Sequence, residues 1–558
     1  MKKPQSSPIF DDSDYPMCFV RKSIFQGTGV DLTEAGKRPI IAIANSLTEI
    51  NPGHMHLGMI AQRVKDGVNA AGGLPFEFDV PAPCDGMTEG HAGMRFVLAQ
   101  RDLIADIIET HVRSMRYDGI VFIASCDKII PGMIMAAARL DLPAIFVTGG
   151  PNVWDIRFKP SMRGAVDHKC YTDLFDKLAT ATAATCGSCE LMGTANTMQC
   201  LAEAAGMTLP FAATARAVSA ERLRLGKASG EAIVRMVFKG ETARSIMGLK
   251  NLENMLRVCM ALGGSTNGVL HILALAGELG LEKNMNIGRV DEFSRTTPCI
   301  SNVQPVGKYY LPDLHEDGGM PAIMAELKPL LNLQARGVDG RTLKDWIKLG
   351  APRLQKVRRS VLSLKKPLLA HGGIAVLKGN LAPISSLARM LNNTIPSHRG
   401  PARCFNSQKE AVTALKSGKV KEGEVIVVRH EGPRGAPGMP DIYALLATVV
   451  GMGLEGKLAV VTDGRFSGFA RGLGVCQVSP EAAVGGPLAL LKNGDMISIN
   501  LHARSLNAEV SDQEWKKRRS QWRPLERKNA PGILGLFAVN AEQAHQGARL
   551  VAHPAPLE

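Results

Sequence analysis

One stretch of the sequence has the strand–helix–strand pattern of a parallel β-sheet. Residues 119–124 (GIVFIA) form a continuous apolar run, which is typical of a strand buried on both faces. A helix is predicted from about Pro131, which suits a first helical turn, to about Leu140, and a second apolar run follows at residues 144–148. This order predicts an α/β domain with a parallel sheet. Functional loops in such sheets follow the carboxyl ends of the strands, so the residues just after position 124 are candidates for a site.

The character of the sequence changes beyond residue 366. A chain of 558 residues exceeds the roughly 250–300 residues that a single core usually organises, so we expect at least two domains. Short apolar runs alternate with glycine-containing turns at residues 373–377, 424–428, 457–462 and 495–500. This pattern predicts a smaller, β-rich, barrel-like domain. We therefore expect an α/β domain at residues 1–366 and a β-rich domain at residues 367–558.

Composition and charge argue against several broad classes. Apolar residues make up 45% and charged residues 21%, which is ordinary for a globular protein and excludes disorder or a coiled coil for the whole chain. The net charge is +14, but the densest basic runs, residues 356–359 and 516–519, lack interleaved aromatic residues, so we expect no nucleic-acid partner. The uncharged stretch from Ile442 to Leu454 falls well short of the ~20 residues that a bilayer requires, so we expect no membrane partner. Eleven cysteines without a secretory signal indicate reduced thiols in a cytoplasmic protein.

Two Cys-Asp pairs are candidates for metal chemistry. Cys126 and Asp127 follow the first predicted strand and precede Lys128, and Cys84 and Asp85 form the second pair. A thiolate suits iron or zinc, whereas a carboxylate suits a hard divalent ion. A buried cysteine beside a helix-capping aspartate is the structural interpretation of the first pair, and the Asp-Gly of the second pair also occurs in simple turns. On these short motifs alone, the structural interpretation is favoured.

Other polar loops leave several interpretations open. Residues 185–189 (TCGSC) suit a redox dithiol, half a zinc site or cluster ligation, although no second CxxC is present to complete a zinc ribbon. The Gly/Pro-rich residues 431–441 either present backbone N–H groups to an anion or position a carboxylate. Ser467 follows the predicted strand that ends at Thr462, and it is either a nucleophile, a base or part of a solvated turn. His54 and His56, two positions apart, give only a weak metal signal.

Taken in order, the motifs resemble the dihydroxy-acid dehydratase/phosphogluconate dehydratase family. The resemblance runs from about Lys37 to Asn507. Its most specific blocks are CDKIIPGM at residues 126–133, TGGP at 148–151, TCGSC at 185–189, GGSTN at 263–267 and TDGRFSG at 462–468.

The resemblance implies an iron–sulfur cluster. Cys126 and Cys189 match the cluster cysteines of the family, and Cys189 is preferred over Cys186 because it keeps register with the Thr-Ala-Asn that follows. Members with a two-iron cluster carry a cysteine directly after the proline of the first motif, where this chain has Gly53. Cys84 matches a cysteine of the phosphogluconate branch and is our candidate for the third ligand. The cluster is therefore either [2Fe–2S] or [4Fe–4S].

The resemblance also implies a magnesium site and a catalytic base. Asp85, Asp127 and Lys128 match the magnesium-site residues, and the lysine is carbamylated in better-studied members of the family. The family's magnesium glutamate, 26 positions before the catalytic serine, is here Asp441, which is one methylene shorter. Ser467 matches the serine that acts as base. Because Ser467 and Cys126 lie in different predicted domains, we expect the active site in the cleft between them.

The implied reaction is dehydration of a small anionic 2,3-dihydroxy acid to a 2-keto acid. The interpretation that we favour is conversion of 2,3-dihydroxyisovalerate to 2-oxoisovalerate in valine and isoleucine biosynthesis. The alternative is the same chemistry on an aldonate in carbohydrate catabolism. A third class, a basic nucleic-acid-binding protein that kept the fold and lost the cluster, draws slight support from Gly53 and Asp441. We expect a homodimer or a dimer of dimers.

Overall fold

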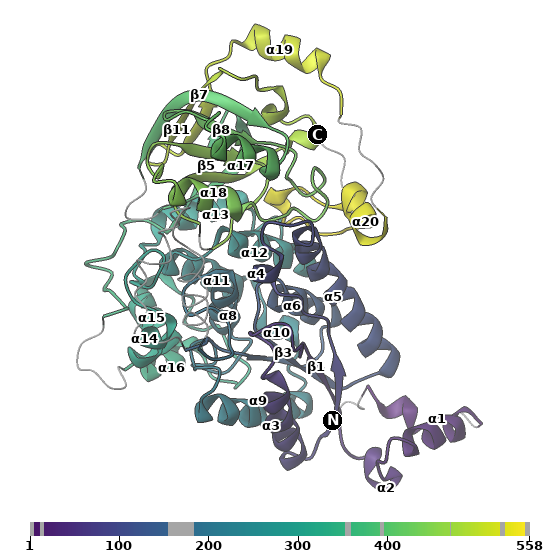
Figure 1. Ribbon diagram of the computed structural model, residues 1–558. Coiled ribbons are helices and arrows are strands. Elements are labelled where there is room, and N and C mark those ends of the chain that lie inside the picture. The colour runs from purple at the N-terminus through teal and green to yellow at the C-terminus, as the bar shows by residue number, and fades with distance from the viewer. Residues whose placement is uncertain are drawn as a thin grey trace.

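The computed structural model describes residues 5–11, 16–153, 184–351, 359–390, 395–468, 470–524 and 531–552. A parallel-sheet α/β region and a closed β-barrel make up this part of the chain, and they lie against each other (Figure 1). Both predicted fold elements are therefore confirmed. The first barrel strand begins at Ile374, and the boundary between residues 366 and 367 stays a prediction.

The sheet of the α/β region has four parallel strands in the described residues, in the order β2-β1-β3-β4. Their bounds are β1 Ile40–Asn45, β2 Leu74–Asp79, β3 Gly119–Ala124 and β4 Ala144–Thr148. All residues of β1, β3 and β4 are buried, in keeping with sequences that are apolar except for Asn45 and Thr148 at the ends of β1 and β4. The edge strand β2 is half-buried and tolerates Pro75, which has no N–H to give to a neighbouring strand.

The strand order reverses between β1 and β3. The chain moves from β1 to one side to form β2 and later from β3 to the other side to form β4. Because such crossovers are right-handed, the connecting helices α3 and α6 lie on opposite faces of the sheet. The crevice at the carboxyl ends of β1 and β3 is then the expected ligand position in an open α/β sheet.

Helices cover the sheet, and further helices beyond it make up the rest of the α/β region (Figure 1). The helices before β4 are α1 Met17–Gln26, α2 Leu32–Ala35, α3 Leu57–Ala70, α4 Asp85–Thr88, α5 Met94–Met115 and α6 Ile129–Leu140. The helices that follow are α8 Thr194–Ala204, α9 Ala220–Lys239, α10 Ala243–Ile246, α11 Leu249–Leu262, α12 Thr266–Leu279, α13 Ile287–Thr296, α14 Leu311–Glu316, α15 Gly319–Glu326 and α16 Leu343–Trp346.

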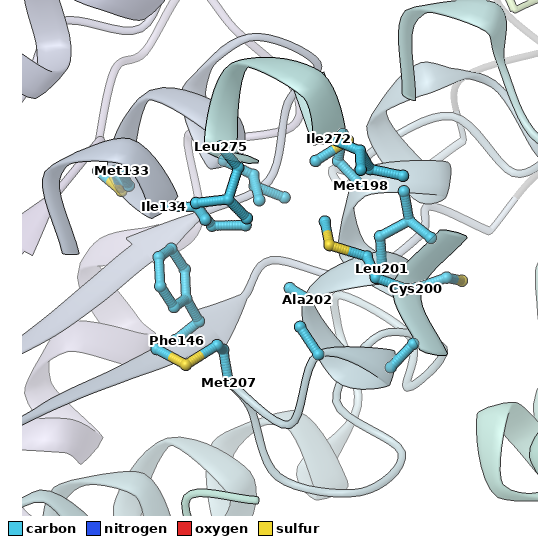
Figure 2. Packing of buried hydrophobic residues seen from close by; sticks show 14 of the residues in the cluster. Met133, Ile134, Phe146, Met198, Cys200, Leu201, Ala202, Met207, Ile272 and Leu275 are labelled. Carbon is cyan, nitrogen blue, oxygen red and sulfur yellow. The ribbon is translucent and has the colours of Figure 1, made fainter. Parts of the chain in front are cut away.

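The core of this region forms where α6, α8 and α12 meet β4 (Figure 2). Ile134 of α6 lies beside Leu275 of α12, and Phe146 of β4 and Leu201 of α8 belong to the same buried cluster. This packing fixes α8, and with it the loop in front of α8, relative to the carboxyl edge of the sheet.

The second region is a closed barrel with the strand order β10-β6-β5-β12-β11-β7-β8-β9. Its strands are β5 Ile374–Gly379, β6 Ala382–Arg389, β7 Ser397–Phe405, β8 Val425–Val428, β9 Ala459–Thr462, β10 Leu473–Ser479, β11 Met496–Asn500 and β12 Ser505–Ala508. Its helices are α17 Gln408–Lys416, α18 Tyr443–Gly451 and α19 Asp512–Gln521. Since β8 and β9 are parallel neighbours, the loops after both strands emerge at the same rim of the barrel.

The C-terminal part of the described chain returns to the α/β region. Helix α20 Gly532–Asn540 packs on α5 (Figure 1), and Leu534 and Phe537 share a buried cluster with Leu98 of α5. The buried guanidinium of Arg101 donates hydrogen bonds to the carbonyl oxygens of Gly547 and Ala548, at 2.9 and 2.8 Å. In the described residues, no helix is long and apolar enough to span a bilayer.

Candidate active site

A cavity of about 590 Å³ lies between the carboxyl edge of the sheet and the rim of the barrel. Seven of the residues proposed from the sequence line it: Cys84, Asp85, Cys126, Asp127, Cys189, Asp441 and Ser467. The eighth, Lys128, is buried directly beside it and forms ion pairs with two of them. The structure therefore brings all eight candidate residues together from loops that are far apart in the sequence.

Three cysteine thiols approach one another in the cavity. Cys84 is the N-cap of α4, Cys126 follows β3, and Cys189 lies on the loop before α8. Burial raises the pKa of the Cys126 thiol well above its usual value, and the neighbouring thiols of Cys84 and Cys189 raise it further. Cys186 does not line the cavity. The arrangement agrees with the choice of Cys189 that the sequence register favours.

The backbone of Cys126 is held by a neutral histidine. His54 is buried, and burial lowers its pKa to about 4. Its Nδ1 lies 2.7 Å from the carbonyl oxygen of Ser46 and its Nε2 lies 3.0 Å from the backbone nitrogen of Cys126. The neutral ring therefore carries its proton on Nδ1, and Nε2 accepts the Cys126 N–H. The sequence pattern showed His54 only as half of a weak metal motif, whereas in the structure it positions a cysteine.

Gly53 provides the space that the Cys126 sulfur occupies. A Cβ atom at position 53 would lie 2.7 Å from Cys126 Sγ and 3.3 Å from Asn51 Oδ1. The same Asn51 oxygen accepts the Gly53 N–H at 3.0 Å and lies 3.5 Å from Cys126 Sγ. Any side chain at position 53, including the cysteine of the two-iron pattern, would therefore require the Cys126 sulfur or this loop to shift.

The buried Lys128 lies between two partly buried carboxylates. Its Nζ is 3.0 Å from Asp85 Oδ2 and 2.7 Å from Asp127 Oδ1. Burial and the adjacent charge of Asp85 raise the pKa of Asp127 well above its usual value. Although burial acts in the opposite direction, Lys128 and a hydrogen bond from Asp127 keep the pKa of Asp85 below its usual value. Asp85 therefore ionises more readily than Asp127, although both carboxyl groups lie beside the buried ammonium of Lys128.

Asp441 reaches the cavity from the barrel rim. Arg465 Nη1 donates to Asp441 Oδ2 at 3.1 Å, and Arg465 Nε donates to the carbonyl oxygen of Met439 at 2.7 Å. Asp441 Oδ1 accepts the N–H of Tyr443 at 3.0 Å. Burial raises the pKa of Asp441 to about 6, against the opposing charge of Arg465. The arginine of the TDGRFSG block therefore anchors this carboxylate, a role that the sequence did not reveal.

Ser467 is held against the first turn of α8. The Nδ2 of Asn267, from the GGSTN block, donates to the carbonyl oxygen of Phe466 and to Thr194 Oγ1, both at 3.2 Å. A Cβ atom at Gly468 would lie 2.8 Å from both the Cα of Gly193 and the backbone nitrogen of Thr194. The GGSTN block therefore holds the loop that carries Ser467 in place but does not line the cavity itself.

The Gly/Pro-rich loop at residues 431–441 binds an anion that belongs to the chain itself. The N–H groups of Arg434 and Gly435 donate to Glu481 Oε2, at 3.1 and 2.7 Å. Gln543 Nε2 donates to the other carboxylate oxygen at 2.6 Å. The loop therefore does both things that its sequence allows: its N–H groups bind the carboxylate of Glu481, and its end places Asp441 in the cavity wall.

Comparison with known proteins places the chain in a family. The family model for the dihydroxy-acid/6-phosphogluconate dehydratase N-terminal region matches residues 38–346, and the C-terminal counterpart matches residues 359–548. The chain belongs to the dihydroxy-acid/6-phosphogluconate dehydratase family. A dihydroxy-acid dehydratase of Methanosarcina barkeri is 42% identical over 550 residues, covering 94% of this chain and 97% of the relative. The dihydroxy-acid dehydratase of Halothermothrix orenii is 43% identical over 542 residues, covering 95% and 97%.

The donor atoms in the cavity suit the two cofactors of this dehydratase family. Thiols are the ligands that iron–sulfur clusters take, and three of them converge here. Carboxylates are the ligands of magnesium, and the raised pKa values of Asp127 and Asp441 indicate buried negative charge that a cation would relieve. Within the described ranges, no three Asp, Glu, His or Cys side chains already surround one point as metal ligands do. Carbamylation of Lys128 would replace the ammonium between Asp85 and Asp127 by a further carboxylate.

One wall of the cavity was not predicted from the sequence. Tyr443, Leu446, Ala447 and Val450 line it from α18, at the i, i+3, i+4 and i+7 positions of one helix face. The apolar periodicity after Asp441 is the signal that would have revealed this wall. Arg471 and Glu190 line the same cavity and are polar.

Proposed function

We propose that this dehydratase converts 2,3-dihydroxyisovalerate to 2-oxoisovalerate, a step of valine and isoleucine biosynthesis. Relatives that carry the name dihydroxy-acid dehydratase match nearly the whole chain at 42–43% identity. The observation that carries the choice of substrate is the α18 wall. Each buried methylene of a branched alkyl group contributes about 0.8 kcal/mol against such a surface.

The same wall disfavours a sugar acid. The hydroxyl groups on C4 to C6 of an aldonate would lose hydrogen bonds to water beside Leu446 and Val450, at a cost of about 1–3 kcal/mol for each unpaired group. Glu190 and Arg471 nevertheless offer polar partners, so aldonate dehydration is the second candidate.

The candidate residues of the cavity form two groups, one of cysteines and one made mainly of carboxylates, and each group has its own chemical role. We assign Cys84, Cys126 and Cys189 to an iron–sulfur cluster. In a [2Fe–2S] or a [4Fe–4S] cluster, three thiolates leave one iron open to a ligand. Asp85, Asp127, Lys128 and Asp441 are assigned to magnesium. When bound, the two cofactors supply Lewis acidity, for the departing C3 hydroxyl and for the negative charge that develops on the carboxylate end.

Ser467 is assigned the role of base. It lines the cavity from the barrel region, and the contacts of Asn267 and Gly468 fix its loop. Its Oγ, as an alkoxide, removes the C2 proton of the dihydroxy acid. The enol that remains after loss of the C3 hydroxyl tautomerises to the 2-keto acid.

Features outside the cavity complete the proposal. We expect a homodimer or a dimer of dimers in the cytoplasm, with no nucleic-acid partner. The basic run at residues 516–519 lies on α19, where Arg518 pairs with Asp495 and Glu514, which supports a solvated surface. Size-exclusion chromatography with light scattering measures the oligomeric state.

Anaerobic turnover tests the assignment. Protein purified without oxygen is supplied with 2,3-dihydroxyisovalerate or with a panel of aldonates, and keto-acid formation is followed for each substrate. We expect kcat/KM for the dihydroxy acid to exceed that for every aldonate by about 10²-fold, since a difference of about 2.7 kcal/mol corresponds to that ratio. A higher value for an aldonate would establish the second candidate instead.

A further inference from the structure

Glu89 is a carboxylate of the cavity for which the proposed mechanism has no role. It directly follows α4, four positions after Asp85, and it lines the cavity. Its Oε2 atom is buried and has no hydrogen-bond partner among the residues that the structure describes. Leaving such an oxygen unpaired costs free energy unless another ligand binds it.

The surroundings of Glu89 are those of the proposed magnesium site. Burial, followed by the charges of Asp441 and Asp85, raises the pKa of Glu89 to about 9. Arg465 and Lys128 act on it in the opposite direction. Glu89 therefore lies within electrostatic reach of both parts of the site, the loop after β2 and the barrel rim.

The charges around this point do not balance without a further cation. Four carboxylates line this cavity: Asp85, Glu89, Asp127 and Asp441. Among the described residues that act on Glu89, the cations are Lys128 and Arg465. With all four carboxylates ionised, four negative and two positive charges would leave a surplus of two negative charges, which one divalent cation would neutralise. Without that cation, the raised pKa values of Glu89 and Asp127 mean that bound protons reduce the surplus. A carbamylated Lys128 would increase the surplus.

Asp441 alone is poorly suited to complete the site. Both of its oxygens are engaged within the barrel rim, one with Arg465 and the other with the Tyr443 N–H. Its side chain is also shorter by one methylene, about 1.5 Å of reach, than the glutamate that the resemblance leads us to expect. Glu89 has the longer side chain and a buried oxygen that is available.

We propose that Glu89 provides a carboxylate ligand to the divalent cation and thereby compensates for the shortened Asp441. This inference rests on the proposed function, because it requires the magnesium site. In this chain, Glu89 from the loop after β2 would take over part of the metal-binding role of Asp441 from the barrel.

Mn²⁺ binding tests the proposal without depending on turnover. Free Mn²⁺ is measured by electron paramagnetic resonance during titration of the anaerobically purified, full-length protein. Glu89→Gln keeps the shape of the side chain and removes its charge, and Glu190→Gln is the matched control because Glu190 is a buried glutamate of the same cavity. We expect Glu89→Gln to weaken Mn²⁺ binding at least ~10-fold, the scale of changes around metal sites, and Glu190→Gln to leave it within about threefold.

A rescue variant distinguishes ligation from general disturbance. Adding Asp441→Glu to Glu89→Gln restores a long carboxylate on the barrel side, and we expect Mn²⁺ affinity to return to within a few-fold of the wild type. An unchanged affinity in Glu89→Gln, an equal loss in Glu190→Gln, or no recovery in the double variant would each overturn the proposal. Wild-type protein that binds no Mn²⁺ would overturn the magnesium site itself, whereas normal wild-type binding and turnover with an unaffected Glu89→Gln would overturn only the role of Glu89.

Discussion

Replacing Gly53 by alanine tests whether the position of the Cys126 sulfur depends on the absence of a side chain in the facing loop. The backbone of Gly53 lies outside the left-handed region, so alanine introduces no conformational strain. The new Cβ would lie 2.7 Å from Cys126 Sγ, whereas ordinary contact begins at 3.4 Å. The sulfur, the loop or both must therefore move apart by at least about 0.7 Å.

The structure sets the expected size of the effect. Inserting a methyl group into a packed site typically costs about 1–3 kcal/mol of folding free energy. The larger consequence is chemical, because misplacement of a reacting group by about 1 Å can lower the rate ~10²-fold. We expect Gly53→Ala to contain less iron per chain than the wild type and to lose about 10- to 100-fold in kcat/KM per cluster.

The measurement combines iron and sulfide content, thermal unfolding and anaerobic turnover. Gly58→Ala is the control, since a Cβ at this position of α3 would meet Leu47 at 3.6 Å, an ordinary contact. The control should retain iron and activity. Full iron content together with wild-type kcat/KM in Gly53→Ala would refute the argument that the sulfur needs this space.

Three further experiments test separate parts of the site. Cys189→Ser should lose the cluster and all activity because serine is a poor ligand for this iron, whereas Cys186→Ser should keep both. The iron content of each purified variant is the measurement, and loss of iron in Cys186→Ser but not in Cys189→Ser would reverse the assignment. Ser467→Ala should keep iron and Mn²⁺ binding and lose turnover by ~10²–10⁴-fold, and exchange of the C2 hydrogen with solvent at the normal rate would show that Ser467 is not the base. Arg465→Met should lower the free energy of unfolding by about 3–5 kcal/mol because it leaves Asp441 buried without its cation, and a denaturant midpoint equal to that of the wild type would contradict this role.

The parallel sheet was predictable because its local patterns are strong. The apolar run of β3, the helix after it and the run of β4 are uniform, and the residues at the end of β3 occupy the expected position. β2 gave a weaker signal, since it is half-buried and contains Pro75. Closure of the barrel was not readable, because it depends on pairing between distant segments such as β6 and β10.

The candidate residues of the cavity were found from their motifs, whereas the residues that hold them in place were not. His54 and Arg465 act through geometry: one accepts the Cys126 N–H, and the other pairs with Asp441. Neither role follows from residue type or spacing. Glu89 escaped notice for the same reason, because its importance depends on which charges surround it in three dimensions.

The most direct test of the account is the spectrum of the reduced protein with and without substrate. Anaerobically purified protein is reduced, and its electron paramagnetic resonance spectrum is recorded before and after addition of 2,3-dihydroxyisovalerate, with iron and sulfide quantified in the same sample. If three cysteines hold a cluster with one iron open to the cavity, the protein contains iron and sulfide and the dihydroxy acid shifts the spectrum. A fully loaded cluster whose spectrum is unchanged by saturating 2,3-dihydroxyisovalerate, or protein that takes up no cluster, would contradict the account.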